Sequence, residues 1–109
     1  MSFEIIATPH FKREIKKLSK KYKSLKVDFS RLVDQLKSNP SQGTPLGNDC
    51  FKIRMAITSK GKGKSAGARI ITHFYFDGNK LFLLSIFDKS IQETITKSEL
   101  RALLENIKK

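Results

Sequence analysis

The stretch Arg69–Phe87, RIITHFYFDGNKLFLLSIF, carries the strongest fold signal in this sequence. β-Branched and aromatic residues precede Asp77-Gly78-Asn79, and a nearly continuous apolar run, Leu81–Phe87, follows it. An Asp-Gly pair between two such runs is typical of a tight β-hairpin turn. We therefore expect two antiparallel strands here, the first of which begins at Arg69.

A third strand is expected upstream of this hairpin. In Cys50–Ile57 the apolar residues alternate with Lys52, Arg54 and Ala56, which is the period of a strand with one buried face. A segment rich in glycine and lysine then leads to Arg69. Before the strand, three turn-forming residues predict that residues 41–49 are a loop: Gly43, Pro45 and Gly47.

The amino-terminal part predicts a short strand over Ser2–Ala7 and then two helices. Thr8-Pro9 provides a helix cap and a proline at the first helical position. Apolar residues recur at helical spacing from Phe11 to Leu25 and again from Phe29 to Leu36, and Asn39-Pro40 ends the second run. Two short consecutive helices of this kind favour a helical hairpin.

A final helix is expected after Thr96-Lys97-Ser98-Glu99, which has the spacing of a capping box. The expected order is therefore β-α-α-β-β-β-α in a single domain, residues 1–109. This order indicates an α+β fold with a mostly antiparallel sheet, helices packed on one face and the other face toward solvent.

Composition limits the possible partners and sites. Twenty-two Lys and Arg against ten Asp and Glu give a net charge of +12 and a pI near 10.0, which favours a polyanionic partner: nucleic acid, an anionic membrane or an acidic protein. One cysteine and two histidines exclude an intrachain disulfide and argue against a zinc cluster or any other metal site. We expect no cofactor and, without an apolar signal segment, a cytoplasmic protein.

The segment Ser59–Arg69, SKGKGKSAGAR, ends like a nucleotide-binding P-loop but departs from that motif. Gly63-Lys64-Ser65 matches the end of the motif, whereas Thr58 stands where its first glycine is required. A P-loop also leads into a helix, and a strand is expected here. The segment is therefore either a phosphate-contacting loop or a solvated surface loop.

The strand pairing predicts a cationic site on the open face of the sheet. Lys52 and Arg54 share the polar face of one strand, Arg69 begins its neighbour and Lys89 follows the last strand. Around them we expect three loop lysines at the rim and one aromatic residue able to stack on a base: Lys60, Lys62, Lys64 and Tyr75. The alternative is a basic surface without chemistry. Cys50 is expected to be a packing residue, because no histidine can be placed beside it.

Cations of this kind suit the cleavage of RNA. The 2′-hydroxyl is the nucleophile, so the protein needs a base, an acid and positive charge to stabilise the pentacovalent phosphate. Lysine can transfer protons, and the arginine fork fits the phosphoryl oxygens. DNA lacks the 2′-hydroxyl, so this route selects RNA.

The chain resembles the RelE/ParE superfamily of bacterial toxins, and within it the RelE/HigB-like mRNA interferases. The resemblance covers nearly the whole chain in element order. It is most specific in three stretches: PLGNDCFKIRM (Pro45–Met55), GKGKSAGARII (Gly61–Ile71) and LLSIFDKSIQETI (Leu83–Ile95). It implies a ribosome-dependent, metal-independent endoribonuclease that cleaves mRNA in the A site, inhibits translation and is silenced by a cognate antitoxin. The implied partners are the antitoxin, the ribosome, mRNA and rRNA, with no membrane.

The resemblance also implies a role for each cation. Lys52 matches a proposed general base, Arg54 a neighbouring cation, Arg69 the arginine that steadies the phosphate and Lys89 a proposed acid. The sequence departs from the family pattern at four positions: Ala66 for glycine, Phe87 for tyrosine, Ile91 for glutamate and Ile95 for a stacking tyrosine. Two alternatives remain: a ParE-like inhibitor of DNA gyrase, and a catalytically inactive module that binds RNA or an antitoxin.

Overall fold

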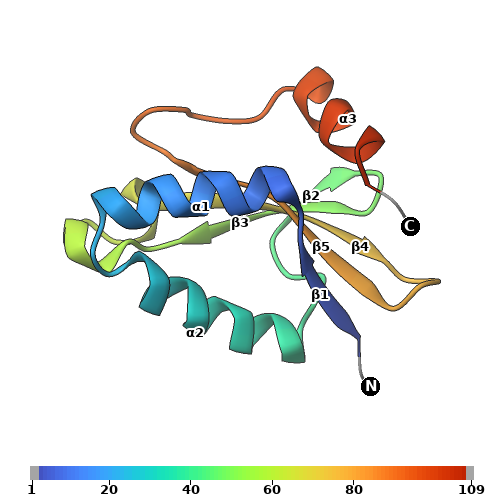
Figure 1. The fold of residues 1–109 in the computed structure, drawn as a ribbon, viewed down its shortest axis with the longest axis horizontal. Coiled ribbons are helices and arrows are strands. Elements are labelled where there is room, and N and C mark those ends of the chain that lie inside the picture. The colour runs from blue at the N-terminus through green and yellow to red at the C-terminus, as the bar shows by residue number, and fades with distance from the viewer. Residues whose placement is uncertain (1–2, 108–109) are drawn as a thin grey trace.

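The computed structural model describes residues 3–107 as three α-helices and one five-stranded sheet (Figure 1). The elements follow one another as β1 (Glu4–Ala7), α1 (Pro9–Lys21), α2 (Leu25–Ser38), β2 (Thr44–Gly47), β3 (Cys50–Met55), the short 3-10 turns η1 (Thr58–Lys60) and η2 (Lys64–Ala66), β4 (Ala68–Tyr75), β5 (Lys80–Asp88) and α3 (Lys97–Glu105). The α+β class and the helical hairpin expected from the sequence are confirmed.

The strands lie in the order β1-β5-β4-β3-β2. The β4–β5 hairpin closes with Tyr75 opposite Lys80, as the Asp-Gly turn predicts. β1 pairs with β5 in parallel, and the other pairs are antiparallel. β2 corrects the expectation that residues 41–49 form a loop. It lies at the sheet edge, where the missing N–H of Pro45 is tolerated because an edge strand has one unpaired side.

The predicted helix starts are present. The Thr8 side chain accepts a hydrogen bond from Phe11 N, and Pro9 occupies the first turn of α1. At α3, Glu99 N donates to Thr96 Oγ1 while Thr96 N donates to Glu99 Oε1, which completes the capping box. No helix within residues 3–107 is long and apolar enough to cross a membrane.

α1 and α2 cover one face of the sheet with the larger apolar core. The buried side chains of this core come from both helices and from β3, β4 and β5, and include Phe11, Leu25, Leu32, Leu36, Ile53, Met55, Ile70, Leu81, Leu83 and Ile86. Glu14 adds a polar contact between the layers, since its carboxylate accepts hydrogen bonds from Ser85 Oγ and Ile86 N of β5.

A second apolar core lies on the opposite face, which the sequence-based expectation had left open to solvent. It joins Leu100 of α3 to buried residues of the sheet: Cys50, Ile71, Phe82, Leu84 and Phe87. The physical reason is the nearly continuous apolar run of β5, which presents large side chains on both faces. Helices therefore pack on both faces of the sheet, and the open part of the second face lies near the ends of β3, β4 and β5 that α3 does not cover.

Candidate nucleic-acid interface

The strand register gathers three of the predicted cations at one end of the sheet. Arg54 of β3 lies directly opposite Arg69 of β4. Lys89 follows β5, and its backbone N–H donates to Gly67 O, just before Arg69. Lys52 is two residues along β3 on the same face, opposite Ile71. This group, Lys52, Arg54, Arg69 and Lys89, is called the cation cluster below.

The two arginines of the cation cluster differ in burial. Arg54 is exposed, whereas Arg69 is only 3% exposed. The Arg69 guanidinium donates to the carbonyl oxygens of Lys64 (2.9 Å), Ala68 (3.1 Å) and Ser65 (3.2 Å). Burial, and then the charge of Arg54, lower the pKa of Arg69. The expectation of an exposed Arg69 is therefore wrong: its fork holds the backbone of the β3–β4 loop.

Lys60 is also directed inward, which corrects its predicted place at the rim. Its side chain is 13% exposed, and its ammonium donates to Asp88 Oδ1 (2.7 Å) and Ala66 O (2.9 Å). It also lies 5.2 Å from the centre of the Tyr22 ring, a cation–π distance. Burial alone lowers the pKa of Lys60, but the hydrogen bond and charge of Asp88 outweigh burial and raise it.

Asp88, at the end of β5, is the residue of this region that the sequence analysis missed. Its carboxylate accepts hydrogen bonds from Lys60 and from the Tyr22 hydroxyl, and from both the N–H and the hydroxyl of Ser90. Burial would raise its pKa, but these donors hold the pKa well below its usual range. The available signal was a carboxylate directly after an apolar strand, in a chain with a large excess of lysine.

The β3–β4 loop is tied down at both ends by polar contacts. Asp28 of α2 accepts hydrogen bonds from Thr58 N (2.9 Å) and from the Thr58 and Ser24 hydroxyls. Burial would raise the pKa of Asp28, but these bonds, with the charge of Arg31, lower it. Polar contacts therefore hold the loop to the domain at its two ends. The side chains of Lys62 and Lys64 at its crest are exposed.

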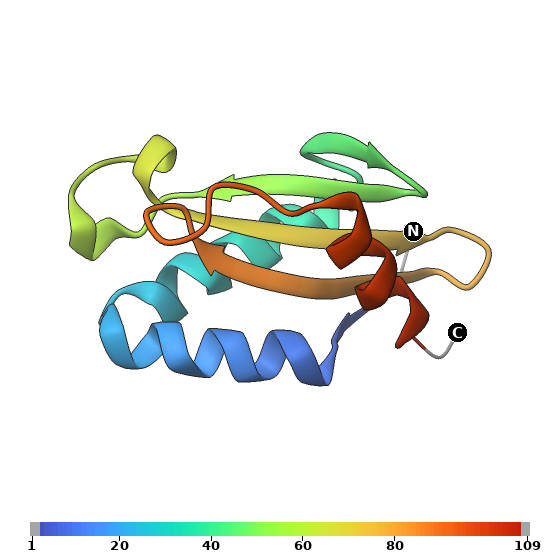
Figure 2. The same cartoon turned by 90° about the horizontal axis from the view of Figure 1, so that it is seen from above.

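Tyr75 does not join the cation cluster. It lies at the opposite end of β4, six residues from Arg69 and therefore about 20 Å away at strand spacing. Figure 2 shows the β3–β4 loop and the β4–β5 turn at opposite ends of the sheet. The Tyr75 ring lies over Gly78 and packs against the second core. Tyr75 therefore lies too far from the cation cluster to stack on a base held there, and stacking of a base on Tyr75 elsewhere stays a prediction.

The departures from the family pattern differ in environment. Phe87 is buried opposite Arg69, and Ile95 packs against the second core, so both are structural in this conformation. Ile91 is 72% exposed. None of the three supplies a polar group to the cation cluster.

Cys50 and His73 lie opposite each other on β3 and β4, with Sγ and Nδ1 3.6 Å apart. The expectation that no histidine lies beside Cys50 is therefore wrong. Both residues are buried, and His73 stacks on Phe82, so the thiol is closed to a macromolecular substrate. Within residues 3–107, no group of three or more His, Cys, Asp or Glu is arranged to hold a metal ion.

No known family model matches the sequence. Solved structures do resemble the fold. The free E. coli toxin RelE, in a variant with two arginines replaced by alanine, superposes with a TM-score of 0.66 at 17% identity, over 98% of this chain and 100% of that one. The same RelE variant bound to a peptide of the antitoxin RelB superposes with a TM-score of 0.57 at 16% identity, over 100% of this chain and 98% of that one. RelE in the intact E. coli RelBE toxin–antitoxin complex superposes with a TM-score of 0.50 at 17% identity, over 80% of this chain and 96% of that one. The chain thus has the RelE fold, as the sequence resemblance implies.

Proposed function

We propose that this protein is the toxin of a toxin–antitoxin pair and a metal-independent endoribonuclease that cleaves mRNA in the ribosomal A site. The observation that carries this proposal is the cation cluster on a sheet with the RelE fold, where Arg54 is exposed and Lys52 and Lys89 are partly exposed. Within residues 3–107 no group of side chains is arranged to hold a metal ion, and concentrated positive charge suits a reaction in which RNA provides its own nucleophile.

The proposed reaction is an in-line transesterification. The 2′-oxygen forms a bond to the adjacent phosphorus as Lys52 removes the 2′-hydroxyl proton. The bond from phosphorus to the 5′-oxygen breaks, and Lys89 gives that oxygen a proton. The products are a 2′,3′-cyclic phosphate and a 5′-hydroxyl. Arg54 stabilises the negative charge of the pentacovalent intermediate.

Arg69 takes a different part from the one the resemblance implies. Because its guanidinium is bound to three carbonyl oxygens, it acts here as a positioning residue for the β3–β4 loop. The loop then presents Lys62 and Lys64 to the RNA backbone beside the cluster. The net charge of +12 fits both partners in this proposal, RNA and an acidic antitoxin.

The test measures mRNA cleavage on purified, translating bacterial ribosomes, with the new 5′ ends mapped by primer extension. The native protein should cut only ribosome-bound mRNA, and its expression without an antitoxin should arrest growth. Arg54→Ala should slow cleavage by roughly 10²–10³, the usual effect of losing one donor to a developing charge. Lys52→Ala should impair cleavage while ribosome binding is retained.

Arg13→Ala is the matched control, since Arg13 is an exposed arginine on α1, across the sheet from the cluster. It should cleave at the native rate. An Arg54→Ala protein that cuts as fast as this control would remove Arg54 from the mechanism. Uncut mRNA together with inhibited DNA gyrase would replace the nuclease proposal with the ParE-like alternative.

A further inference from the structure

One buried carboxylate organises the turn that carries Lys89, the proposed acid. The backbone carbonyl of Asp88 accepts hydrogen bonds from Ile91 N and Gln92 N, each at 3.0 Å. The Asp88 side chain accepts hydrogen bonds from Ser90 N (3.0 Å) and Ser90 Oγ (2.7 Å). The backbone that follows Lys89 is therefore tied to the residue directly before it.

The same carboxylate is linked to the β3–β4 loop. The Lys60 ammonium donates both to Asp88 Oδ1 (2.7 Å) and to Ala66 O (2.9 Å). The Arg69 guanidinium binds the carbonyl oxygens of the two residues before Ala66. Two cations thus hold three consecutive carbonyl oxygens of the loop, and Asp88 holds one of these cations. Hydrogen bonds and one short stretch of backbone therefore connect the turn of Lys89 with Arg69.

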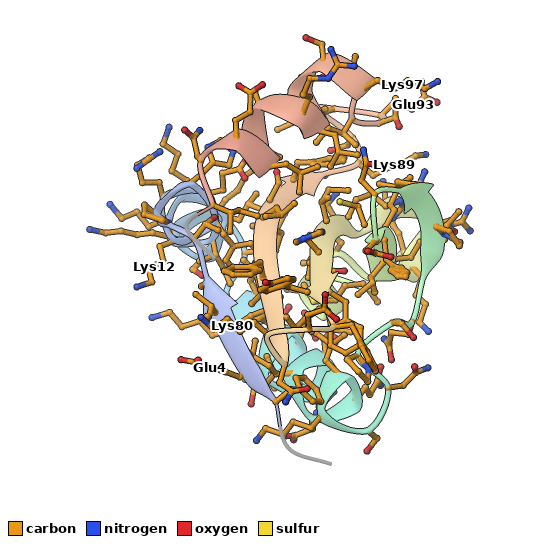
Figure 3. All side chains as sticks on the ribbon, turned by 90° about the vertical axis from the view of Figure 1, so that its right-hand side faces the viewer. Glu4, Lys12, Lys80, Lys89, Glu93 and Lys97 are labelled. Carbon is orange, nitrogen blue, oxygen red and sulfur yellow. The ribbon has the colours of Figure 1, made fainter. Side chains whose placement is uncertain are left out.

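Asp88 does not reach a substrate phosphate itself. Its side chain is only 1% exposed. Successive residues of a strand point to opposite faces, so Asp88 turns toward the end of α1, where the Tyr22 hydroxyl donates to it, and Lys89 turns toward the face of the cation cluster. Figure 3 shows Lys89 on the side of the domain near α3, away from Lys12 of α1. Any effect of Asp88 on the reaction therefore passes through the residues that it holds.

The Asp88 carboxylate is a fixed anion. Burial would raise its pKa, but the hydrogen bonds from Lys60, Tyr22 and Ser90 hold the pKa well below its usual range. Asp88 is therefore ionised at neutral pH and is not a source of protons. Because backbone and side-chain donors converge on it, its own position is also fixed. Such a group can hold its neighbours within the roughly 0.5 Å that a reacting site requires.

We propose that Asp88 is a positioning residue for the cleavage proposed above, on which this inference rests. It sets Lys89 relative to the β3–β4 loop, so that the Lys89 ammonium meets the leaving 5′-oxygen while the loop lysines hold the RNA backbone beside it. In this step the bond from phosphorus to the 5′-oxygen breaks, and a proton passes from Lys89 to that oxygen. Without the carboxylate, Lys89 and the loop lose their common support, and the proton is delivered in the wrong geometry.

The test replaces the leaving 5′-oxygen by sulfur at the mapped cleavage position of a short synthetic mRNA bound to ribosomes. A thiolate leaves without being protonated, because a thiol is a much stronger acid than an alcohol. On the natural oxygen substrate Asp88→Asn should lower kcat roughly 10²-fold, the usual cost of a misplacement of about 1 Å, with an unchanged KM for ribosomes. On the sulfur substrate Asp88→Asn and Lys89→Ala should both cut at close to the native rate.

The matched control is Asp28→Asn, which neutralises another buried carboxylate whose hydrogen bonds lie at the other end of the loop. Any loss in this control should be equal on the two substrates. Tyr22→Phe is a milder form of the main variant, since it removes one donor to Asp88 and keeps the ring beside Lys60. It should lose less on oxygen and recover on sulfur, and it carries the comparison if thermal melts show that Asp88→Asn does not fold.

The outcomes separate this inference from the nuclease proposal. A loss that is equal on the oxygen and sulfur substrates would overturn the inference, because Asp88 would then serve the fold alone, while the nuclease proposal would stand. Native kinetics of Asp88→Asn on the oxygen substrate would overturn it as well. A native protein that cuts neither substrate would remove the nuclease proposal and, with it, any positioning role. A defect confined to the oxygen substrate would establish the role of Asp88.

Discussion

Lys60 and Lys62 are two residues apart in the same lysine–glycine repeat, yet the structure uses them in opposite ways. Lys60 turns into the domain and binds Asp88 beneath the Tyr22 ring, whereas Lys62 points into solvent at the crest of the loop. The two arginines beside the loop divide in the same manner, with Arg69 buried and Arg54 exposed. The loop therefore has two parts. Lys60 and Arg69 hold its foot to the domain, and this part is called the anchored base below; Lys62 and Lys64 form an exposed crest.

The difference shows that lysine in a basic loop does not by itself indicate a partner. A buried cation that meets a carboxylate or carbonyl oxygen contributes to the fold, and only the remaining cations are available to RNA. In this chain the anchored base uses Lys60 and Arg69, and the crest keeps Lys62 and Lys64.

The largest effect on stability is expected from removing the Asp88 carboxylate, which accepts the hydrogen bond of Lys60 at the anchored base of the loop. Asp88→Ala leaves the Lys60 ammonium largely buried without its carboxylate, and breaking one side of such a pair costs about 3–5 kcal/mol. Asp34→Ala is the control, because Asp34 pairs with Lys37 on the surface and both side chains are well exposed. Urea unfolding should show a loss of about 3 kcal/mol for Asp88→Ala and under about 1 kcal/mol for Asp34→Ala. Equal losses would contradict the anchored base.

The two arginines provide a matched pair for the second prediction. Arg69→Ala removes three charge-assisted hydrogen bonds to loop carbonyls and should destabilise the protein by roughly 2 kcal/mol. Arg54→Ala should change the free energy of unfolding by less than about 0.5 kcal/mol, as exposed substitutions usually do. Urea melts of the two variants side by side give the comparison, and Arg69→Ala as stable as Arg54→Ala would show that the guanidinium does not hold the loop.

Low pH should weaken the contacts that Asp88 makes at the anchored base of the loop, and so lower the stability of the protein. The pKa of the Asp88 carboxyl in the folded state lies below its unfolded value of about 3.9. Its contribution is therefore complete above that unfolded value and is lost as pH falls through the folded pKa. Between pH 5 and pH 3 the urea midpoint of the native protein should fall more steeply than that of Asp88→Asn. Parallel profiles for the two proteins would contradict a stabilising charge at Asp88.

The smallest effect on stability is expected at the crest. Lys62→Ala and Lys64→Ala should each change the free energy of unfolding by less than about 0.5 kcal/mol, since both side chains are exposed. Each should nevertheless reduce RNA affinity and the salt dependence of binding, because a phosphate contact is lost. A large loss of stability in either variant would show that the crest is packed in the same way as the base.

Features with local signals were predictable from the sequence. The β4–β5 hairpin follows from Asp77-Gly78, and the start of α3 from the Thr96–Glu99 capping box, because each depends on residues within one turn. The meeting of Arg54 and Arg69 also follows from the alternation of two neighbouring strands.

Features that depend on distant partners were not predictable in this way. Lys60 and Asp88 are 28 residues apart, and nothing in the loop indicates which acid it meets. No carboxylate lies between Met55 and Phe76, so the loop appears uncompensated until β5 brings Asp88 to its base. The packing of α3 on the second face of the sheet was also missed. Antiparallel sheets commonly leave one face to solvent, but the apolar run of β5 places large side chains on both faces, so both faces need cover.

The parallel pairing of β1 with β5 has a consequence for synthesis of the chain. Thr8, directly after β1, donates its hydroxyl hydrogen bond to Leu83 O, 75 residues later. At about 5–20 residues per second, roughly 4–15 seconds of translation separate the two partners. The first strand must therefore wait, unpaired, until most of the chain has left the exit tunnel, and such non-local contacts also slow the search for the native topology. Any nascent chain that stops before β5 lacks the central partner of both β1 and β4 and has no complete sheet.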